Sequence, residues 1–243
     1  WCWGNNPFNG AITGRPWPLR LPNEGLQAEQ LAAGRAHVCA RMSDGAVACA
    51  GRNDQGQLGV AEDTPNDGEL HPVEDVVGAV HIAAGGDQTC ILDADRALHC
   101  WGRRNERDQG EGEVPTGLRA LPGFGEVAQL SVGAWHVCAV DVEGVARCLG
   151  GNGSGQIQPG AGIRLDITEL RPLGIGIRIA SLEAYRSETC ALTTDGRVYC
   201  WGRGQGDPRH PEEVAGLTEV ERLFPGSMAD HRCAERQDGS LWC

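Results

Sequence analysis

The sequence contains no lysine, because all 21 of its basic residues are arginine. Mechanisms that need a lysine Schiff base or the lysine of a phosphate-binding loop are therefore excluded. No run of 18 apolar residues occurs, so we expect no membrane insertion. The Gly-x-Ser-x-Gly nucleophile motif is also missing. We therefore expect no catalytic residues, no cofactor and no enzymatic activity.

Basic charge is scarce relative to acidic charge, since the net charge is −12 and the isoelectric point is about 5.0. An acidic surface repels phosphate backbones, so we expect no nucleic-acid partner. Turn-forming residues are abundant instead, with 36 glycines and 13 prolines among 243 residues. This content is typical of a fold with many tight turns, and the length suits one large all-β domain or two small ones.

Ten of the eleven cysteines form five pairs, and the two members of each pair lie ten positions apart. The pairs are Cys39 with Cys49, Cys90 with Cys100, Cys138 with Cys148, Cys190 with Cys200 and Cys233 with Cys243, and Cys2 is left over. Cysteines that bind zinc are commonly spaced much more closely than this. The regular separation instead suggests one disulfide in each copy of a repeat, and no metal site.

Each segment between paired cysteines has the pattern of a hairpin with a three-residue loop, for example Ser43-Asp44-Gly45. Glycine at the third loop position is typical of a type I turn followed by a bulge, and only Arg96 departs from it. In this register Cys39 lies opposite Cys49, within reach of a disulfide. Disulfides persist mainly outside the cytosol, which predicts a secreted, periplasmic or cell-surface protein. The alternative is paired buried thiols in a cytosolic protein.

The similarity between copies extends beyond the cysteines. A strand of small residues, such as Leu31-Ala32-Ala33-Gly34, precedes each pair, and a Trp-Gly step follows the second cysteine in several copies. First cysteines recur every 43 to 52 residues, and four short strands per unit at this period predict a β-propeller. We expect repeats at 25–75, 76–122, 123–173 and 174–216, a truncated repeat at 217–243, and the end of a preceding repeat at 1–24.

A proline-led stretch closes each unit, and we expect it to be the outermost strand because proline suits a sheet edge. The stretches are Pro18-Leu19, His71-Pro72, Val114-Pro115, Arg171-Pro172 and His210-Pro211. The prediction is thus an all-β propeller of about five four-stranded antiparallel blades with one disulfide in each. Cys2 and Cys243 occupy the same place in the repeat, so we expect part of a longer array or a ring whose closure differs from the repeat phase.

The units resemble the regulator of chromosome condensation repeat, most clearly between Gly34 and Gly59. The resemblance lies in the small-residue strand, the histidine, the Asp-Gly hairpin, the Trp-Gly turn and the Gly-Gln-Leu-Gly loop. It implies a seven-bladed ring, and the cysteine pairs look like those of exported bacterial relatives. Nucleotide exchange and chromatin binding by the eukaryotic relative do not suit an acidic, disulfide-bonded protein. A secreted bacterial β-lactamase inhibitor of the family, which grips a protein with loops on one face, is the better precedent.

Histidine precedes the first cysteine by two positions in three copies, at His37, His136 and His231. A metal ring is one reading, but we favour a structural role in which each imidazole binds neighbouring backbone and fixes its blade. Carboxylates cluster in two loops, at Glu62, Asp63, Asp67 and Glu69 and at Glu111 and Glu113. We interpret them as solvated loop charges, with glycoside hydrolysis or weak calcium binding as alternatives.

Function is expected where the repeats diverge, because loops on a rigid scaffold carry binding residues. The short loop between the small-residue strand and the histidine varies most, and it holds residue types enriched at binding hot spots. Its partner-binding candidates are Arg35, Asp87, Trp135, Tyr185, Arg186, Met228 and Asp230. Trp135 could instead merely cap its blade. The second candidate is the turn after Trp-Gly, with Asn5, Asn6, Arg52, Asn53, Arg103, Arg104, Asn152 and Arg203.

These loops predict a non-catalytic scaffold that recognises a protein or peptide through one face of the propeller. The first alternative is a carbohydrate-binding lectin in which Trp135 and Tyr185 stack on sugars. The second is a structural module of a larger surface protein. The loop residues differ from repeat to repeat, which favours one asymmetric protein partner over several equivalent sugar sites.

Overall fold

The structure is a computed structural model, and all its regular elements in the described residues are β-strands. The described residues are 27–61, 63–65, 69–103, 117–158, 167–172, 178–202, 211–224, 226 and 231–243, with only the backbone considered at 167–172. Their strands form five antiparallel sheets, four of four strands and one of three. We call these sheets the first to fifth blades, in chain order.

The first two blades contain β1 (Ala28–Ala33), β2 (His37–Met42), β3 (Val47–Gly51) and β4 (His71–Pro72), then β5 (His81–Gly85), β6 (Gln88–Leu92), β7 (Leu98–Gly102) and β8 (Arg119–Ala120). The third contains β9 (Val127–Val132), β10 (His136–Asp141), β11 (Ala146–Gly150) and β12 (Ile167–Pro172). The fourth contains β13 (Ile179–Ala184), β14 (Glu188–Thr193), β15 (Val198–Gly202) and β16 (Glu212–Glu213). The fifth contains β17 (Val220–Leu223), β18 (Ala234–Arg236) and β19 (Leu241–Trp242).

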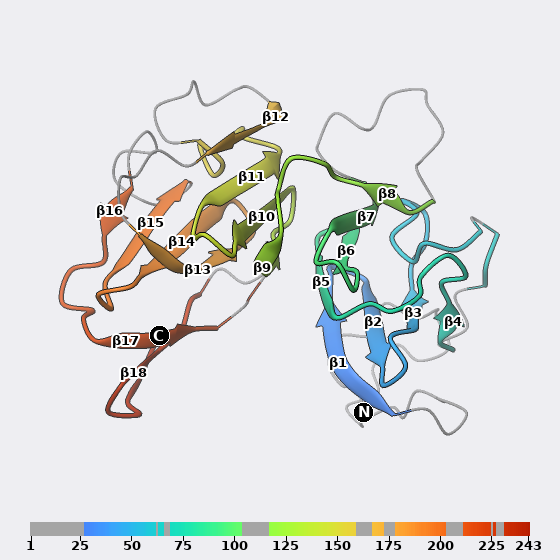
Figure 1. The fold of residues 1–243 in the computed structure, drawn as a ribbon, viewed down its shortest axis with the longest axis horizontal. Helices are drawn as coiled ribbons and strands as arrows, with labels where there is room; N and C mark the ends of the chain where they lie inside the picture. Colours follow the sequence, from blue (N-terminus) through green and yellow to red (C-terminus); the bar gives the residue numbers. More distant parts are fainter. Residues whose placement is uncertain are drawn as a thin grey trace.

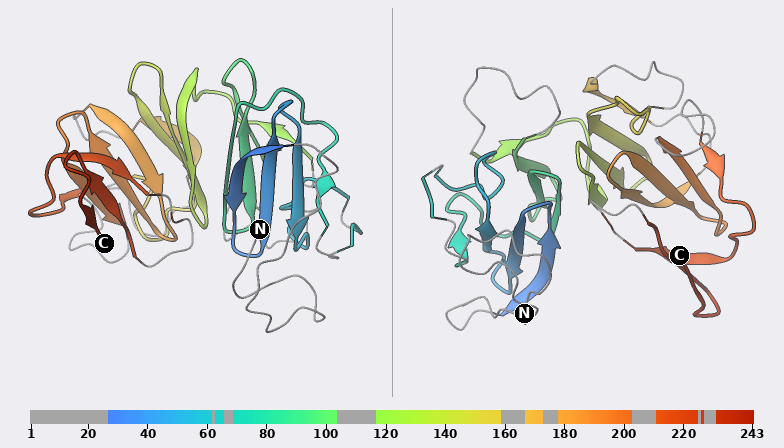
Figure 2. Two further views of the ribbon diagram at one scale, coloured as in Figure 1. Left: turned by 90° about the horizontal axis from the view of Figure 1, so that it is seen from below. Right: turned by 180° about the vertical axis from the view of Figure 1, so that it is seen from behind.

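The blades follow one another around an arc, as Figure 1 shows, and each is a simple up-and-down sheet. The innermost strands β1, β5, β9, β13 and β17 contact one another in chain order, and β4, β8, β12 and β16 lie on the perimeter. Figure 2 shows from two further sides that the connecting loops gather at the ends of the sheets. This arrangement confirms the all-β propeller expected from the repeat period.

The five predicted disulfides are all present, with Cα–Cα distances of 4.1 to 4.2 Å. They join Cys39 to Cys49, Cys90 to Cys100, Cys138 to Cys148, Cys190 to Cys200 and Cys233 to Cys243. Each bond therefore lies within one blade; in the first four blades it joins the second and third strands, and in the fifth it joins the residues just before β18 and just after β19. In each of the four four-stranded blades the second cysteine is also the ladder partner of a residue in the edge strand.

The predicted hairpin register is confirmed. Cys39 is the direct partner of Cys49 in the β2–β3 ladder, as expected from a three-residue loop. Gly45 closes this loop with a φ of 81° and donates its N–H to the Met42 carbonyl. Arg96 occupies the same place with a φ of 58°, a left-handed conformation that glycine adopts more easily.

The outer strands agree with the expected proline-led stretches in part. Pro72 ends β4 and Pro172 ends β12, whereas β16 begins just after Pro211. In the second blade the outer strand is Arg119–Ala120, and the expected Val114-Pro115 stretch lies outside the described residues. Each sheet falls within one expected repeat range, and residues 1–24, with Cys2, also lie outside the described part of the chain.

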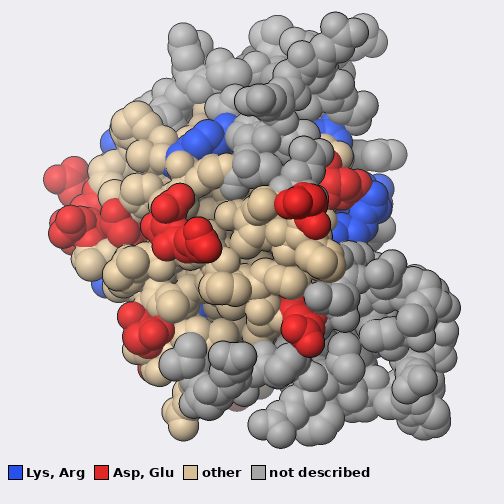
Figure 3. Space-filling model, turned by 90° about the vertical axis from the view of Figure 1, so that its right-hand side faces the viewer, with Lys and Arg blue, Asp and Glu red and all other residues tan. Residues whose placement is uncertain are grey.

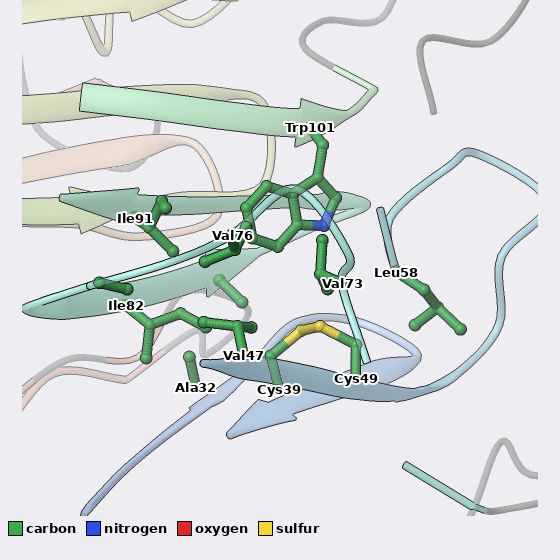
Figure 4. Close-up of a cluster of buried hydrophobic side chains, with 12 residues drawn as sticks. Ala32, Cys39, Val47, Cys49, Leu58, Val73, Val76, Ile82, Ile91 and Trp101 are labelled. Atoms are coloured by element: carbon green, nitrogen blue, oxygen red, sulfur yellow. A yellow bond between two sulfur atoms is a disulfide. The ribbon is translucent and has the colours of Figure 1, made fainter. Parts of the chain in front are cut away.

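The first and second blades pack through a shared apolar core. Figure 4 shows Trp101 of β7 beside Val73, with the Cys39–Cys49 disulfide of the first blade below. Leu58, from the loop between β3 and β4, joins the same core, and both Leu58 and Trp101 are fully buried. The disulfide therefore clamps its own hairpin and also supplies an apolar surface for the next blade.

Hydrogen bonds among side chains and backbone also cross this interface. The Gln30 side chain donates to the Ile82 carbonyl and accepts from the Ile82 N–H, at 3.0 and 3.1 Å. His37 Nε2 lies 2.8 Å from the Thr89 hydroxyl oxygen, and Trp101 Nε1 donates to the Gln57 carbonyl at 3.0 Å. The structural role expected for His37 holds, but its partner is a side-chain hydroxyl of the next blade rather than backbone.

The interface between the third and fourth blades repeats these contacts. Gln129 bonds both backbone groups of Leu182, His136 Nε2 lies 2.9 Å from the Thr189 hydroxyl oxygen, and Trp201 donates to the Gln156 carbonyl. Between the second and third blades the corresponding positions hold Gln88, Val137 and Leu149, which differ in chemistry. Between the fourth and fifth blades an ion pair of Glu188 with Arg232 takes the place of the His–Thr bond. The contacts thus repeat every two blades, although the sequence repeats every blade.

Candidate binding face

The two loop sets expected as rival binding sites lie on the same face of the propeller. The Arg52 N–H donates to the Ala36 carbonyl, the Arg103 N–H donates to the Asp87 carbonyl, and the Gly151 N–H donates to the Trp135 carbonyl. Each of the first three blades therefore joins its inner loop to the residues that follow its third strand. We define the loop face as residues 34–36, 52–54, 86–87, 103, 134–135, 151–153 and 186–187.

An ion pair connects the loop face of the first blade to that of the second. Arg35 Nη2 donates to Asp87 Oδ2 at 2.9 Å, and the Arg35 N–H donates to the Gly86 carbonyl at 2.8 Å. The Arg35 side chain is 46 % exposed, whereas that of Asp87 is only 1 % exposed. Burial raises the pKa of Asp87, an effect that the nearby charge of Arg35 opposes. Asp87 therefore positions Arg35 and presents almost no surface to a partner.

A cation–π contact connects the second blade to the third. The Arg103 guanidinium lies 4.9 Å from the centre of the Trp135 ring. Arg103 is buried and Trp135 is half-buried, so one part of the indole packs on the arginine and another part faces solvent. Such a contact contributes on the order of 1 kcal/mol and fixes the ring in one orientation. Trp135 can therefore pack against the neighbouring blade and still present part of its ring to a partner.

Tyr185 and Arg186 have opposite placements although they are neighbours. Tyr185 is 1 % exposed, and its hydroxyl donates to the Phe224 carbonyl at 3.1 Å. Burial raises the pKa of its phenol far above the ordinary value. The expectation that Tyr185 contacts a partner therefore conflicts with its burial between blades. Arg186 is exposed, while Met228 and Asp230 lie outside the described residues.

Among the described candidates in the turns after the third strands, only Arg52 is exposed. It forms an ion pair with Asp54, and the two side chains are 48 % and 46 % exposed. Asn53 and Asn152 are buried instead, because each amide oxygen accepts a backbone N–H from its own loop. Asn5, Asn6, Arg104 and Arg203 lie outside the described residues. The buried asparagines can be recognised in the sequence, because each is followed four positions later by a glutamine. Both side chains of this Asn-x-x-x-Gln pattern bond to the backbone of their own loop.

The histidines do not approach one another as a metal site requires. His37 and His136 lie in different interfaces, and burial lowers the pKa of each from 6.5 to about 4. Among the described residues, no group of three or more His, Cys, Asp or Glu side chains is arranged to hold a metal ion. Of the two carboxylate-rich loops, only Asp63 and Glu69 are described.

A cavity of about 670 Å³ lies along the inner strands of the third to fifth blades. Its lining residues are Gln129, Ser181, Glu183, Glu221, Arg222, Leu223 and Glu235. Burial raises the pKa of Glu183 to about 7, and the Ser131 hydroxyl donates to this carboxylate at 2.9 Å. None of the lining residues is aromatic, so this cavity lacks the stacking platform that sugars commonly use.

The acidic charge of the chain is visible on the flank of the molecule. Figure 3 shows carboxylate side chains in several separate groups over the described surface, with arginines near its edges. Within the part of the chain that the structure describes, no helix has the length and apolarity needed to span a membrane.

The comparisons with known proteins agree with this architecture. The family model described as regulator of chromosome condensation (RCC1) repeat matches residues 28–57, 79–109 and 179–205. The ultraviolet-B receptor UVR8 of Arabidopsis thaliana is 33 % identical over 187 residues, which cover 72 % of this chain and 41 % of the receptor. The chain thus spans less than half the length of that relative.

Two solved structures share the fold. Human WBSCR16 has a TM-score of 0.78 at 21 % identity, and the match covers 98 % of this chain and 67 % of that one. Prp20p of Saccharomyces cerevisiae, described with its binding properties to Gsp1p and histones, has a TM-score of 0.73 at 21 % identity and covers 87 % of this chain and 56 % of that one. The repeat matches and the five propeller sheets lead to one conclusion: the chain belongs to the regulator of chromosome condensation repeat family.

Proposed function

We propose that the chain is a non-catalytic scaffold that binds a protein or peptide through the loop face. The observation that carries this proposal is the pair of contacts Arg35–Asp87 and Arg103–Trp135. They connect the loops of three consecutive blades, so side chains from separate repeats form one continuous surface. A surface fixed before binding loses little conformational entropy when a partner docks.

The residue types on this surface suit protein recognition. Arginine and tryptophan are enriched among residues that dominate binding energy, and here the half-buried Trp135 packs against Arg103, with Arg35 and Arg52 elsewhere on the same loop face. Prp20p, which has the same fold, was described with binding properties to other proteins. That likeness concerns the fold, so it supports a scaffold role and names no partner for this chain.

Recognition of carbohydrate is the weaker candidate. The sugar-stacking pair expected from the sequence was Trp135 and Tyr185, but Tyr185 is buried with its hydroxyl bonded to the Phe224 carbonyl. A single half-buried indole provides less stacking surface than a lectin site with two exposed rings. Five disulfides support an extracytoplasmic location, because such bonds persist mainly in oxidising compartments.

The proposal is tested by selecting a phage-displayed library of random dodecapeptides on the oxidised protein. The recovered peptides are then titrated against Trp135→Ala and Arg35→Ala, with Arg197→Gln in the β14–β15 turn as the control. We expect at least tenfold weaker binding to the first two variants and unchanged binding to the control. Unchanged binding to Trp135→Ala, with circular dichroism showing an intact fold, overturns the loop face as the recognition surface.

A further inference from the structure

The cavity beside the inner strands of the fourth and fifth blades opens where one bridging side chain is missing. In the first and third blades, Gln30 and Gln129 each bond both backbone groups of a residue in the next inner strand. Ser181 holds the same place in the fourth blade, and its short side chain lines the cavity instead. The volume of about 670 Å³ lies within the range of roughly 300 to 1,000 Å³ that small-molecule sites occupy. The repeat is thus modified at the place where the cavity lies.

A buried carboxylate is the second departure from the repeat at this cavity. Glu183 lines it, whereas the other blades have uncharged side chains at the same place, Ala32, Ala83, Ser131 and Phe224. Glu183 is only 8 % exposed. The Ser131 hydroxyl donates to Glu183 Oε2 at 2.9 Å, but Gln129 Nε2 lies 3.3 Å from Oε1, longer than the usual range of about 2.7 to 3.2 Å. A buried carboxylate without a counter-ion is costly, and a cation in the cavity relieves this cost.

The cavity has an excess of negative charge. Its lining includes three carboxylates and one guanidinium. The guanidinium of Arg222 forms an ion pair with Glu235 at 2.7 Å and packs on the Phe224 ring, so its charge is already matched. Glu221 lies at a bulge in β17, which explains how two consecutive residues can line the same cavity. Among the described residues, Glu183 and Glu221 therefore have no cation as a partner.

We propose that this cavity binds an organic cation of the guanidinium type, such as an arginine side chain. A guanidinium has five N–H donors and no acceptor, which suits a lining of carboxylates and the Ser181 hydroxyl. The cavity is large enough for a whole arginine side chain. None of its lining residues belongs to the loop face, so this site and the proposed function stand or fall separately.

The test compares two ligands of the same shape that differ in charge. N-acetyl-arginine amide carries a guanidinium, and N-acetyl-citrulline amide carries a neutral urea in its place. Isothermal titration calorimetry with the oxidised protein should detect binding of the arginine compound and at least tenfold weaker binding of the citrulline compound. Equal binding of the two compounds, or no binding of the arginine compound at millimolar concentration, overturns the proposal.

Carboxylate variants separate the cavity from general charge attraction. Glu183→Gln and Glu221→Gln should each weaken binding of the arginine compound several-fold. Glu74→Gln removes an exposed carboxylate from the loop after β4, far along the chain from the cavity, and should leave binding unchanged. An equal loss in Glu74→Gln shows diffuse attraction to an acidic protein and overturns the proposal.

A variant that fills the cavity tests its location. Ser181→Gln introduces the bridging residue of the first and third blades, which can bond the backbone of Leu223 in the fifth. We expect this variant to lose binding of the arginine compound while its stability in urea is unchanged or higher. Binding retained by folded Ser181→Gln protein overturns the cavity as the site, and the two glutamate variants decide the matter if Ser181→Gln does not fold.

The pH dependence of binding is an independent readout. Burial raises the pKa of Glu183 to about 7, so a cation that prefers the ionised carboxylate should bind about tenfold more weakly at about pH 6 than at about pH 8. The other charged or titratable groups around it are Glu221, Arg222, Glu235 and Tyr185. The dependence should be reduced in Glu183→Gln. An unchanged dependence in that variant contradicts the role of Glu183.

Two further titrations distinguish the sources of such a cation. Butylguanidinium represents a small free cation, and the peptide acetyl-Gly-Arg-Gly-amide represents an arginine of a partner chain. Tighter binding of the peptide assigns the cavity to a partner's arginine, and tighter binding of butylguanidinium assigns it to a free cation. Either result supports the site, whereas failure of both ligands to bind overturns it.

Discussion

His37 Nε2 lies 2.8 Å from the Thr89 hydroxyl oxygen, and both side chains are buried between the first and second blades. The threonine hydroxyl in turn donates to the Gln57 carbonyl at 2.9 Å, in the loop that also receives the Trp101 N–H. This leaves the hydroxyl oxygen to accept a hydrogen bond from His37 Nε2–H, which fixes the tautomer of the imidazole. One threonine thus joins a strand and a loop of the preceding blade.

The first prediction concerns this hydroxyl. Thr89→Val keeps the side-chain shape but leaves the buried His37 N–H without its acceptor. We expect a loss of about 1 to 3 kcal/mol in the free energy of unfolding, the cost of an unsatisfied buried polar group. Thr189→Val, which breaks the matching bond to His136, should cost a similar amount, and the exposed Thr194→Val should cost little. Urea denaturation measures all three, and equal stability of Thr89→Val and Thr194→Val contradicts the role of the bond.

The hairpin at the centre of each blade could be predicted from the sequence, because its register depends on residues close together in the chain. The ten-residue cysteine spacing and the glycine at the third loop position set the hairpin register, and Cys39 is indeed opposite Cys49. The proline-led stretches located the outer strands less well, since the second blade forms that strand at Arg119–Ala120. A two-residue edge strand is held by few hydrogen bonds, so its sequence specifies it weakly.

Contacts between blades were predicted poorly because they join residues about 50 positions apart. The alternation of His37, Gln88, His136 and Glu188 is visible in the sequence. It does not reveal that Thr89 is the partner of His37, or that the contacts repeat every two blades. Tyr185 was misread for a similar reason: it replaces a loop glycine, but its ring turns inward to the fifth blade. Whether a loop side chain points inward or outward depends on its contacts with the neighbouring blade. The sequence of one repeat does not show these contacts.

The second prediction concerns acid sensitivity. Burial lowers the pKa of His37 and His136 from 6.5 to about 4, so the unfolded chain takes up these protons more readily than the folded one. Their contribution to stability is therefore complete above pH 6.5 and is lost as the pH falls to about 4. The expected loss is about 3 kcal/mol for each histidine. Glu183, with its pKa raised to about 7, acts in the opposite sense, since its contribution grows as the pH falls.

Histidine variants separate the pH dependence caused by the two histidines from that caused by Glu183. His37→Gln and His136→Gln introduce the residue that Gln88 supplies at the same place in the second blade. The difference in unfolding free energy between the native chain and each variant should shrink from pH 7 to pH 4. Urea denaturation at four or five pH values measures this difference. A difference that stays constant over this range means that the histidines are not buried in the neutral form.

The third prediction concerns the approach of a loop to the next blade. A Cβ added to Gly59 would lie 2.8 Å from Trp101 Nε1, and Gly59 has a φ of +72°. Gly78 has a similar φ of +68° but no neighbour within 4 Å of an added Cβ. Gly78→Ala should therefore cost about 1 kcal/mol from backbone strain alone. Gly59→Ala should cost at least about 1 kcal/mol more, because it also displaces the indole.

The comparison of these two glycine variants has a spectroscopic readout. Displacement of the Trp101 indole from its buried site should shift tryptophan fluorescence to longer wavelength in Gly59→Ala and leave it unchanged in Gly78→Ala. Equal stability and equal spectra for the two variants contradict the close packing of Gly59 on Trp101.

The fourth prediction concerns the five disulfides. Each closes a short loop, which should contribute about 2 to 3 kcal/mol by restricting the unfolded chain. An arginine lies between the two cysteines of every pair, at Arg41, Arg96, Arg147, Arg197 and Arg236. Trypsin therefore cuts inside every loop, and each intact bond leaves its own linked pair of peptides. Mass spectrometry of the unreduced digest should detect five such pairs. Free thiols at any of these ten cysteines, or bonds between different blades, contradict the clamped hairpin and remove the main support for an extracytoplasmic location.

The contribution to stability is measured with a variant in which alanine replaces both Cys138 and Cys148. Its free energy of unfolding should be lower by about 2 to 3 kcal/mol.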